Sequence, residues 1–263
     1  MLAGVLELRA DCARCAGLCC VGPALTRSAD FAIDKPAGQP CPNLRDDHRC
    51  GIHAHLRERG FPGCTVYDCF GAGQQTVQVT FGGASSQPRD ELLAAFAVLR
   101  PLHELLWHLD AARGIAAAAA LRPALDEQVS RVTELAAAPA ASLAEIDVVG
   151  LRGDAHVLLQ EASRLARAGT PARDLRGADL IGKKPRGDLT GANLQGAYLI
   201  GADLRGRRLD RADLIGADLR AADLRGADLS TALFLTQPQV NAAVGDASTR
   251  LPAGLDRPPH WAS

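Results

Sequence analysis

The feature that most constrains this chain is a leucine that recurs every five residues through its last third. The surrounding motif reads Ala-Asp-Leu-x-Gly, as at residues 202–206. A period of five matches neither the 3.6 residues of a helical turn nor the two of a strand. On a helix, each step would turn the leucine by about 140°, so no apolar stripe would form. The recurring positions are Leu189, Leu194, Leu199, Leu204, Leu209, Leu214, Leu219, Leu224 and Leu229, and Phe234 takes the next one.

An internal repeat that carries its own turn residues predicts a solenoid. If five residues form one side of a coil, every leucine can point inward together with the alanine two places before it. The glycine two places after it can form the corner. Residues 178–235 resemble the pentapeptide-repeat family, whose pattern is A-(D/N)-L-x-x. The resemblance implies a right-handed quadrilateral β-helix with four repeats per coil.

Two irregularities interrupt the repeats, which begin near Arg173 with Leu175 and Leu180 in the inward positions. Leu180 and Leu189 are nine residues apart, one short of two repeats. The intervening residues 183–186, Lys-Lys-Pro-Arg, are predicted to bulge as a basic loop, which is either solvated or binds an anion or a partner. Arg207 stands where a small inward residue belongs, so a local distortion is expected there.

The tail after the repeats is predicted to cover the open end of the solenoid, which would otherwise expose its core. Thr236-Gln-Pro238-Gln239 is typical of a helix start. We expect a helix near Pro238–Val244, with Trp261 folded back onto it. The β-helix would then span 171–236, and its cap 237–263.

Cysteine is confined to the other end of the chain. All eight cysteines lie between Cys12 and Cys69. The start, Met1–Leu8, lacks the features of a signal peptide, and no stretch is predicted to span a membrane. We therefore expect a cytoplasmic protein, and in a reducing cytoplasm such clustering favours metal or redox chemistry over disulfides. The candidate metal ligands are Cys12, Cys15, Cys19, Cys20, Cys41, Cys50, Cys64 and Cys69, with His48, His53 and His55 as further candidates.

Residues 1–82 are predicted to form a small Cys-rich metal-binding domain. Cys12-x-x-Cys15 can place two thiolates on one ion. Cys19 and Cys20 are adjacent and diverge in extended backbone, so one of them either serves a second metal or stays free. The eight thiols could form two four-cysteine sites, one cluster with spare thiols, or mixed sites with histidine. Short strands are predicted at Phe31–Ile33 and Thr76–Phe81.

The order of these cysteines resembles the CxxCxxCC family of zinc- or iron-chelating domains, which runs C-x-x-C, C-C, C-P-x-L, C-x-I-(Y/H) and a late cysteine pair. Three residues rather than two precede Cys19-Cys20 here, and four separate the last pair. The resemblance implies zinc or iron binding, with an iron–sulfur cluster or copper as alternatives, and no particular reaction. Gly71-Ala-Gly73 reads as a turn, because no helix with a phosphate-binding lysine follows it. No nucleotide is therefore expected.

The middle of the chain, residues 86–170, is predicted to be a small antiparallel α-helical bundle. Pro88 marks a helix start, Pro101 is expected to break or kink that helix, and Ser142–Glu145 reads as a capping box. His103 and His108 lie five residues apart and share no helix face, so they are interpreted as structural or solvent-facing. An outer apolar stripe of the bundle could form a homodimer.

The overall charge excludes some partners. A net charge of −1 provides no bulk field to recruit nucleic acid or a membrane. The best-known role in the pentapeptide-repeat family is mimicry of DNA by long acidic β-helices that bind gyrase. Three short coils with nine Asp against eleven Lys and Arg over residues 173–236 do not fit that role.

Two functional hypotheses remain from the sequence. The first is a metal-binding scaffold of the bacterial cytoplasm that presents a rigid β-helix to a protein partner. The alternative is a metal- or iron–sulfur-dependent redox or modification enzyme that acts on a protein or peptide. No catalytic residues can be named, because no nucleophile, base or paired carboxylates stand at a catalytic spacing.

Overall fold

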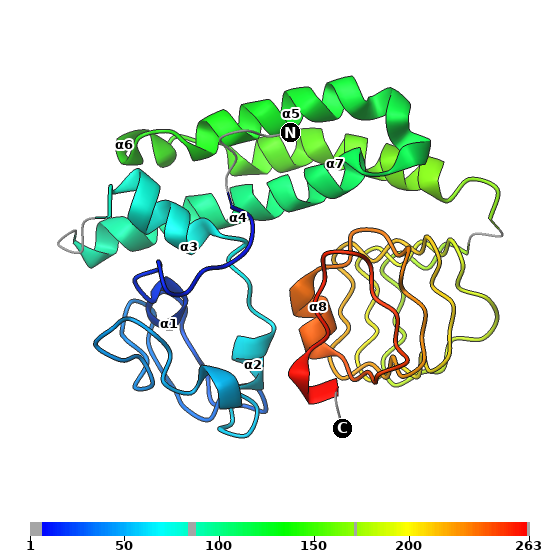
Figure 1. Ribbon diagram of the computed structural model, residues 1–263, viewed down its shortest axis with the longest axis horizontal. Helices are drawn as coiled ribbons and strands as arrows, with labels where there is room; N and C mark the ends of the chain where they lie inside the picture. Colours follow the sequence, from blue (N-terminus) through cyan, green and yellow to red (C-terminus); the bar gives the residue numbers. More distant parts are fainter. Residues whose placement is uncertain (1–6, 84–87, 171–172, 262–263) are drawn as a thin grey trace. The chain divides into compact units, whose positions relative to one another are not determined.

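The computed structural model describes residues 7–83, 88–170 and 173–261 (Figure 1). The chain divides into two compact units. The first comprises Met1–Arg113 and Leu121–Leu159, and the second Gly114–Ala120 and Gln160–Ser263. The Cys-rich segment and most of the helical residues belong to the first unit, whereas the repeats and the tail belong to the second.

The helical elements of the described residues lie outside the repeats. The short ones of the Cys-rich segment are α1 (Leu18–Val21), η1 (His53–His55), α2 (Pro62–Thr65), α3 (Ala72–Gln74) and η2 (Gln75–Thr80). Those that follow are α4 (Arg89–Arg113), η3 (Ala116–Leu121), α5 (Arg122–Ala136), α6 (Ala140–Leu143), α7 (Val148–Ala166), α8 (Gln237–Ala242) and η4 (Pro259–Trp261).

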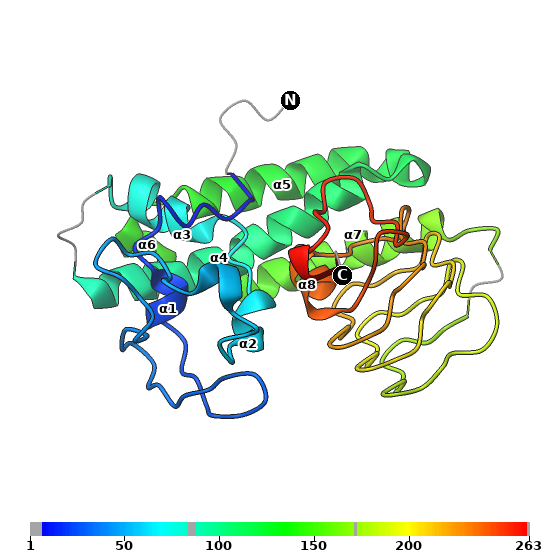
Figure 2. The same cartoon turned by 60° about the horizontal axis from the view of Figure 1, so that its bottom comes forward.

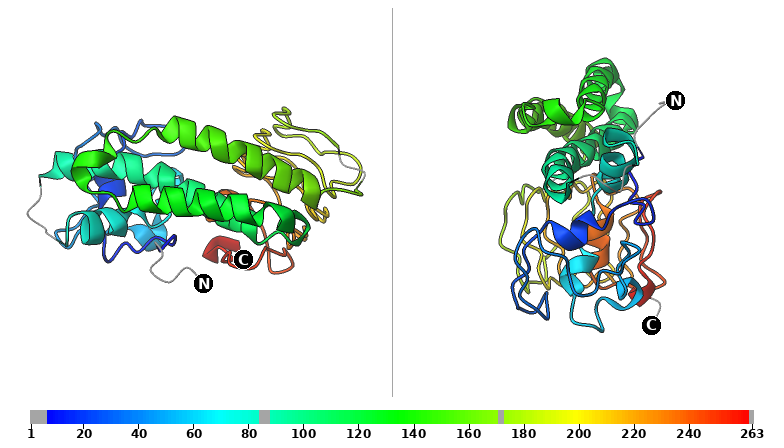
Figure 3. Two further views of the ribbon diagram at one scale, coloured as in Figure 1. Left: turned by 90° about the horizontal axis from the view of Figure 1, so that it is seen from above. Right: turned by 90° about the vertical axis from the view of Figure 1, so that its left-hand side faces the viewer.

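Helix α4 begins directly after Pro88, as predicted, and runs beside α5 (Figure 3). Of the two predicted effects of Pro101, a break or a kink, the break does not occur, because the helix continues to Arg113. A proline inside a helix costs about 3 kcal/mol. Leu99 and Leu102, on either side of it, are fully buried. Each buried leucine contributes about 1.5–3 kcal/mol, which offsets that cost.

Helix α4 is also long and apolar enough, by length and composition, to cross a membrane. The expectation that no stretch approaches a transmembrane span was therefore wrong on these two criteria. Half of the apolar window is buried inside the structure. The core helix of a soluble protein meets the same criteria, so the finding is weak evidence for a membrane.

The predicted capping box at Ser142–Glu145 was wrong. Ser142 lies inside α6, and its N–H donates to Pro139 O at 2.9 Å. The residue that starts α7 is Asp147, whose Oδ1 accepts the N–H of Gly150 at 2.9 Å. A carboxylate accepts from this otherwise unsatisfied N–H and also interacts favourably with the positive end of the helix dipole. Asp147 is therefore a better N-cap for α7 than Ser142.

Both strands predicted in the Cys-rich segment were wrong. Residues 31–33 have irregular backbone, between Leu25 and Lys35, which form an isolated antiparallel bridge. Residues 75–80 form the π-helical turn η2. Here Thr76 is fully buried and its hydroxyl donates to Ala72 O at 2.7 Å, so a local hydrogen bond and packing override the alternating pattern.

His103 has a structural role, as expected. It is fully buried on α4, and its Nδ1 lies 2.7 Å from Phe70 O in the Cys-rich segment. Because a carbonyl only accepts, Nδ1 carries the proton. Burial lowers the pKa of His103 to about 4, against a weaker opposite effect of the Phe70 carbonyl. The histidine is therefore neutral in the folded protein at neutral pH.

The repeats form the predicted four-sided coils, which stack as successive turns from yellow to orange in Figure 2. Parallel bridges join residues twenty apart, which is four repeats per coil. They are Asn193–Asp213, Tyr198–Asp218, Asp203–Asp223, Arg208–Asp228 and Asp213–Leu233. Each side holds only a few residues between two corners, so the bridges stay isolated and no longer strand is present among the described residues.

The first coil is one residue shorter than the others. Its bridges join Asp174 to Asn193 and Asp179 to Tyr198, which is nineteen residues in each case. This agrees with the missing residue between Leu180 and Leu189. The predicted bulge of residues 183–186 is confirmed only in part. Lys183 stays in the hydrogen-bond ladder, since its O accepts the N–H of Asp203 at 2.9 Å, and among the described residues the ladder breaks off after it and resumes at Gly191.

The inward positions are filled as the repeat predicts, with two corrections. Leucines and alanines of the repeats form one buried cluster. Phe234 is buried, but the residue that joins this cluster is Leu235. No distortion occurs at Arg207, whose backbone bonds to Leu204 and Asp228 match those of Ala202. Its Nη1 donates to Gly187 O at 3.2 Å. Gly187 stands at the equivalent position of the preceding coil and has no side chain to block this contact.

The tail covers the end of the solenoid, but the ladder continues past the predicted end of the β-helix at residue 236, with parallel bridges from Asp223 to Val244 and from Asp228 to Arg250. Thr236 and Gln239 form a capping box at the start of α8. Val240 is fully buried in the β-helix core, and Trp261 returns to it with its Nε1 donating to Ala243 O at 3.0 Å. The coil thus ends against a side chain large enough to cover its last leucines.

The end of α7 within the second unit is held to the coils by a buried carboxylate. Asp213 is completely buried, and it accepts hydrogen bonds from the Ser163 hydroxyl, from Gln195 Nε2 at 2.6 Å and from its neighbour Ile215 N at 3.0 Å. A buried carboxylate requires such partners, because its transfer out of water is costly. The other repeat aspartates are at least partly exposed.

Replacing Ala221 by glycine should stabilise the β-helix. Ala221 occupies a corner with φ of 55°, where the preceding coil carries Gly201 with φ of 62°. An alanine in the left-handed conformation costs about 1–2 kcal/mol, which glycine avoids. Part of this gain in stability is lost, because glycine has more conformational freedom in the unfolded chain. We expect an increase of about 0.5–1 kcal/mol in the free energy of unfolding, measured with denaturant. The control Ala222→Gly removes a buried methyl one residue later and should destabilise instead; equal effects would contradict the corner assignment.

The stability of the protein should fall as the pH drops from about 6.5 to about 4 because of His103. Its pKa is depressed in the folded state, so in this window the unfolded chain binds a proton that the folded chain does not. The loss should reach about 3 kcal/mol at the acid end. His103→Gln, which can still donate to Phe70 O, should flatten this part of the pH profile, whereas His156→Gln at an exposed position should not. Identical profiles for both variants would show that other groups cause the dependence.

Candidate metal centre

The first group of thiols surrounds Gly73. A Cβ built on Gly73 would lie 2.7 Å from Cys15 Sγ and 3.7 Å from Cys69 Sγ. The two sulfur atoms therefore occupy the space that any side chain at residue 73 would need. The chain turns sharply here, since Gly71 has a φ of 81° and the Ala72 N–H donates to Cys69 O at 2.9 Å. The glycine-rich segment Gly71–Gly73 therefore packs directly against the thiols of Cys15 and Cys69.

Cys12 and Cys19 belong to the same group. Burial raises the pKa of Cys12 to about 11 and that of Cys15 to about 12, and in both cases the neighbouring Cys19 and Cys69 thiols raise it further. Backbone N–H groups of residues 17 and 18 face the Cys15 sulfur and oppose this shift, and those of residues 71 and 73 face Cys69. Such N–H donors are the usual supports of thiolate ligands.

The second group consists of Cys20, Cys41, Cys50 and Cys64. The Cys41 N–H donates to Cys20 O at 3.0 Å, and Leu44 links Cys41 to Cys50 through a hydrogen bond and a bridge. Cys50 and Cys64 pack against one small core made by Leu25, Leu56 and Phe61. Burial raises the pKa of Cys64 to about 11, with further contributions from Cys41, Cys19 and Cys50.

Cys19 and Cys20 join the two groups, since they are adjacent in α1. A hydrogen bond with Cys20 and burial raise the pKa of Cys19. The eight cysteines are all free thiols. Over residues 7–83, 88–170 and 173–261, no three Cys, His, Asp or Glu side chains stand close enough together to hold an ion as they are placed. Binding therefore requires the thiols to lose protons and rotate inward.

The donor chemistry of these residues is that of thiols. The Cys15 and Cys69 sulfur atoms lie against the Cβ position of Gly73, and backbone N–H groups face both of them. Soft thiolate ligands suit zinc, iron–sulfur clusters and copper(I). The three candidate histidines contribute less. All are exposed, His53 and His55 lie on η1, and His55 Nδ1 is 3.7 Å from Glu58.

A cavity of about 230 Å³ reaches the first thiol group. Cys15 forms part of its wall together with the charged or polar residues Arg14, His48 and Arg89. Its other side is apolar, with Leu18, Val77 and Leu92. Cys15 thus stands between the thiol group and a space large enough for a small molecule.

Lys35 is a buried charged residue near these thiols that sequence reasoning missed. It is only 5% exposed, and its ammonium donates to the carbonyl oxygens of Val21, Pro36 and Gln39 at 2.8–3.0 Å. Burial lowers the pKa of Lys35, and the Cys41 and Cys20 thiols act in the opposite direction. Nothing in the local sequence signals this, because the three acceptors come from two loops that only the fold brings together.

An aromatic and charged cluster borders the first group as well. The Arg100 guanidinium carbon lies 5.6 Å from the centre of the Tyr67 ring and 5.7 Å from that of Phe70, and its Nε donates to Asp68 O at 3.2 Å. These contacts attach the Tyr67–Phe70 segment, which carries Cys69, to α4. The cluster holds the loop in place.

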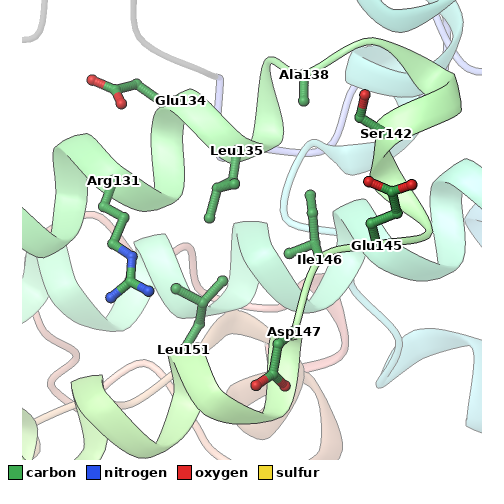
Figure 4. Close-up of a pocket in the computed structure, with 9 residues that line it drawn as sticks. All are labelled: Arg131, Glu134, Leu135, Ala138, Ser142, Glu145, Ile146, Asp147 and Leu151. Atoms are coloured by element: carbon green, nitrogen blue, oxygen red, sulfur yellow. The ribbon is translucent and has the colours of Figure 1, made fainter.

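The wider groove of the helical part offers less chemistry. Its volume is about 520 Å³, and Leu135, Ile146 and Leu151 form its apolar floor (Figure 4). Glu134 and Glu145 lie at its edge. Arg131 is engaged with Asp154 at 3.1 Å. Carboxylates spread along an open rim, with no base or thiol against them, do not form a catalytic arrangement.

Comparisons with known proteins agree with the coil geometry. The pentapeptide-repeat model, with eight copies, matches residues 188–226 and 197–234. The protein YybG of Bacillus subtilis (strain 168) is 44% identical over 265 residues, which cover 97% of this chain and 95% of YybG. The chain is a pentapeptide-repeat protein of the YybG family. The similarity to YybG includes the Cys-rich segment and the helices as well as the repeats.

Two solved pentapeptide-repeat proteins match part of this YybG relative. Rfr23 from the cyanobacterium Cyanothece 51142 is 33% identical over 30% of this chain and 53% of its own, with a TM-score of 0.25. A protein from the thylakoid lumen of Arabidopsis thaliana is 30% identical over 32% of this chain and 55% of its own, with a TM-score of 0.23. This chain spans about half the length of each.

Replacing Gly73 by alanine should weaken metal binding. The new Cβ would stand 2.7 Å from Cys15 Sγ, so Cys15 or the α3 backbone must move away from Cys69. We expect the metal content of the purified protein, measured by elemental analysis, to fall by about one ion per chain. Gly153→Ala is the matched control, because its Cβ meets nothing within 4 Å and helix propensity favours it by about 1 kcal/mol. Full metal retention by Gly73→Ala would remove this glycine from the site.

Proposed function

We propose that the protein is a metal-binding scaffold of the cytoplasm, in which the Cys-rich segment binds zinc or iron and the β-helix contacts a protein partner. The observation that carries the proposal is the presence of eight free thiols in one segment, two of which, Cys15 and Cys69, lie against the Cβ position of Gly73. Free thiols so close together are otherwise prone to oxidation, and a metal would keep them in a single state.

The residues of the first group are suited to hold thiolates once they lose their protons. Their backbone N–H donors stabilise the charged sulfur, and the hydrophobic surroundings keep water out. A fully coordinated zinc supplies folding free energy and no reaction. This suits a segment whose regular structure is limited to helices of three to six residues.

The charges of the β-helix support a protein partner rather than a role as a DNA mimic. Three of its partly exposed aspartates pair with the arginine two residues later, namely Asp203–Arg205 at 2.8 Å, Asp218–Arg220 at 2.6 Å and Asp223–Arg225 at 2.5 Å. A duplex presents unpaired negative charges at regular intervals, whereas these faces carry both signs side by side. Gyrase modulation is therefore disfavoured.

The metal content of protein purified without oxygen tests the proposal. We expect one or two zinc ions per chain by elemental analysis and no visible colour on the same sample. Chelation followed by dialysis should lower the thermal midpoint, since the ion contributes to folding. Iron or copper with charge-transfer bands would instead favour the redox alternative, for which the cavity beside Cys15 offers an entrance.

Absence of any metal, with all eight thiols open to titration in the folded protein, would refute the metal proposal. The control for adventitious binding is a variant with serine at Cys12, Cys15, Cys41 and Cys64, which removes two thiols from each group. This variant should bind no metal while it keeps the β-helix, whose unit contains no cysteine.

A further inference from the structure

The arginines of the β-helix differ in their partners. One set forms ion pairs with aspartates at 2.5–3.5 Å, namely Arg205–Asp203, Arg208–Asp210, Arg220–Asp218, Arg225–Asp223 and Arg250–Asp228. By contrast, Arg173, Arg186 and Arg207 form no ion pair with a carboxylate of the described residues, and the first and last of them bind backbone carbonyls instead. Their positive charges are therefore available to a ligand.

These three arginines meet at the segment 184–187, where the ladder of the coils is interrupted. Arg173 Nη1 donates to Arg186 O, and Arg207 Nη1 donates to the next carbonyl, Gly187 O, at 3.2 Å. No backbone N–H of the described residues uses these two carbonyls. Gly187 has a φ of 80°, and a Cβ placed there would lie 3.9 Å from Arg173 Nη1. Guanidinium groups from two successive coils thus approach the same short stretch of backbone.

The other charges nearby do not compensate this cluster. The two lysines of the loop are already engaged, in the ion pairs Lys184–Asp203 at 3.1 Å and Lys183–Asp179 at 3.9 Å. Asp188 follows Gly187, but its Oδ1 accepts the Thr190 N–H at 2.9 Å. Three positive charges therefore face one carboxylate that is directed elsewhere. Because like charges repel at short distance, a bound anion would stabilise this arrangement.

The geometry of the cluster suits an oxyanion of more than one charge. Arg173 and Arg207 each use one of five N–H donors on the carbonyls, and the remaining donors lie in a plane that can bind two oxygens at once. Elsewhere in the β-helix one carboxylate is matched to one arginine. Three arginines match a phosphate monoester, which carries a charge of about −1.5 to −2 and three acceptor oxygens.

The surroundings favour a single phosphate on a protein over a nucleic acid. A nucleic acid needs a continuous row of cations, whereas the coils carry aspartates at regular intervals and the net charge of the chain is −1. Arg173 and Arg186 are exposed on the outside of the coil. A free phosphate there would stay largely hydrated, but a phosphorylated side chain gains further contacts from the protein that carries it.

From these observations we propose that Arg173, Arg186 and Arg207 form a binding site for a phosphorylated side chain of a partner protein. The interruption of the coil supplies the two unused carbonyls that hold the arginines in place. This inference rests on the part of the proposed function in which the β-helix contacts a protein, and it adds the chemical group that is recognised. It does not depend on whether the thiols bind a metal.

The test measures binding of the labelled full chain to two random peptide libraries, whose fixed central residue is phosphoserine in one and serine in the other. We expect the phosphoserine library to bind at least about tenfold more tightly. Arg207→Gln should remove most of this difference. Arg186→Gln should do the same while both arginine–carbonyl contacts remain, because these use only the backbone of residues 186 and 187. The control Arg225→Gln removes an arginine that is paired with Asp223 and should bind as the unchanged protein does.

Inorganic phosphate and single-stranded DNA serve as competitors, and we expect both to displace the phosphopeptides only at a large excess. Displacement by either one at the concentration of the phosphopeptides would overturn the assignment to a phosphorylated protein. No binding, or equal binding of both libraries, would overturn the site itself. If Arg207→Gln does not fold, Arg186→Gln decides, and unchanged binding by that variant would also overturn the site. The metal content of the protein tests the metal-binding part of the proposed function independently of all these outcomes.

Discussion

The structure of the second unit depends on a left-handed corner two residues after the inward leucines, of which Leu229 is an exception because it is followed by Thr231. Glycine reaches this conformation without strain, and Arg211 and Ala221 are held in it by the coils around them. The corner lets five residues form one side, and twenty residues then close a coil whose interior is mainly leucine and alanine. Every other property of the solenoid, including the outward charges and the need for a cap, follows from that closure.

The first unit, by contrast, contains no sequence repeat. Its Cys-rich segment has little regular structure, and its order comes from specific polar contacts. Lys35 binds three carbonyls, His103 binds Phe70 O, and Arg100 holds the Tyr67–Phe70 loop. Each of these groups is costly to bury alone, so each contact fixes a single loop position. Under the proposed function, thiolate ligands on a metal would add to such a segment the constraints that a hydrophobic core supplies elsewhere.

The parts predictable from the sequence are those set by local repetition. The coil length, the shortened first coil, the basic loop and the Trp261 cap all followed from counting residues. The predictions failed where tertiary contacts decide. Thr76 joins a helical turn, Asp147 rather than Ser142 starts α7, and Pro101 is tolerated in α4. The candidate ligands could be named from their spacing. Neither their grouping around Gly73 nor the burial of Lys35 near them could be predicted, because both depend on contacts that only the fold creates.

The irregular residues of the solenoid give it a single alignment. In a perfect pentapeptide array, any coil could pair with its neighbour after a slip of five residues and still bury leucine on leucine. Asp213 has its partners Ser163 and Gln195 in only one such alignment, and Arg207 meets the bare Gly187 in only one. A slipped chain would bury a carboxylate without donors. The residues that depart from the repeat therefore make its folded state unique, and they destabilise misaligned intermediates during folding.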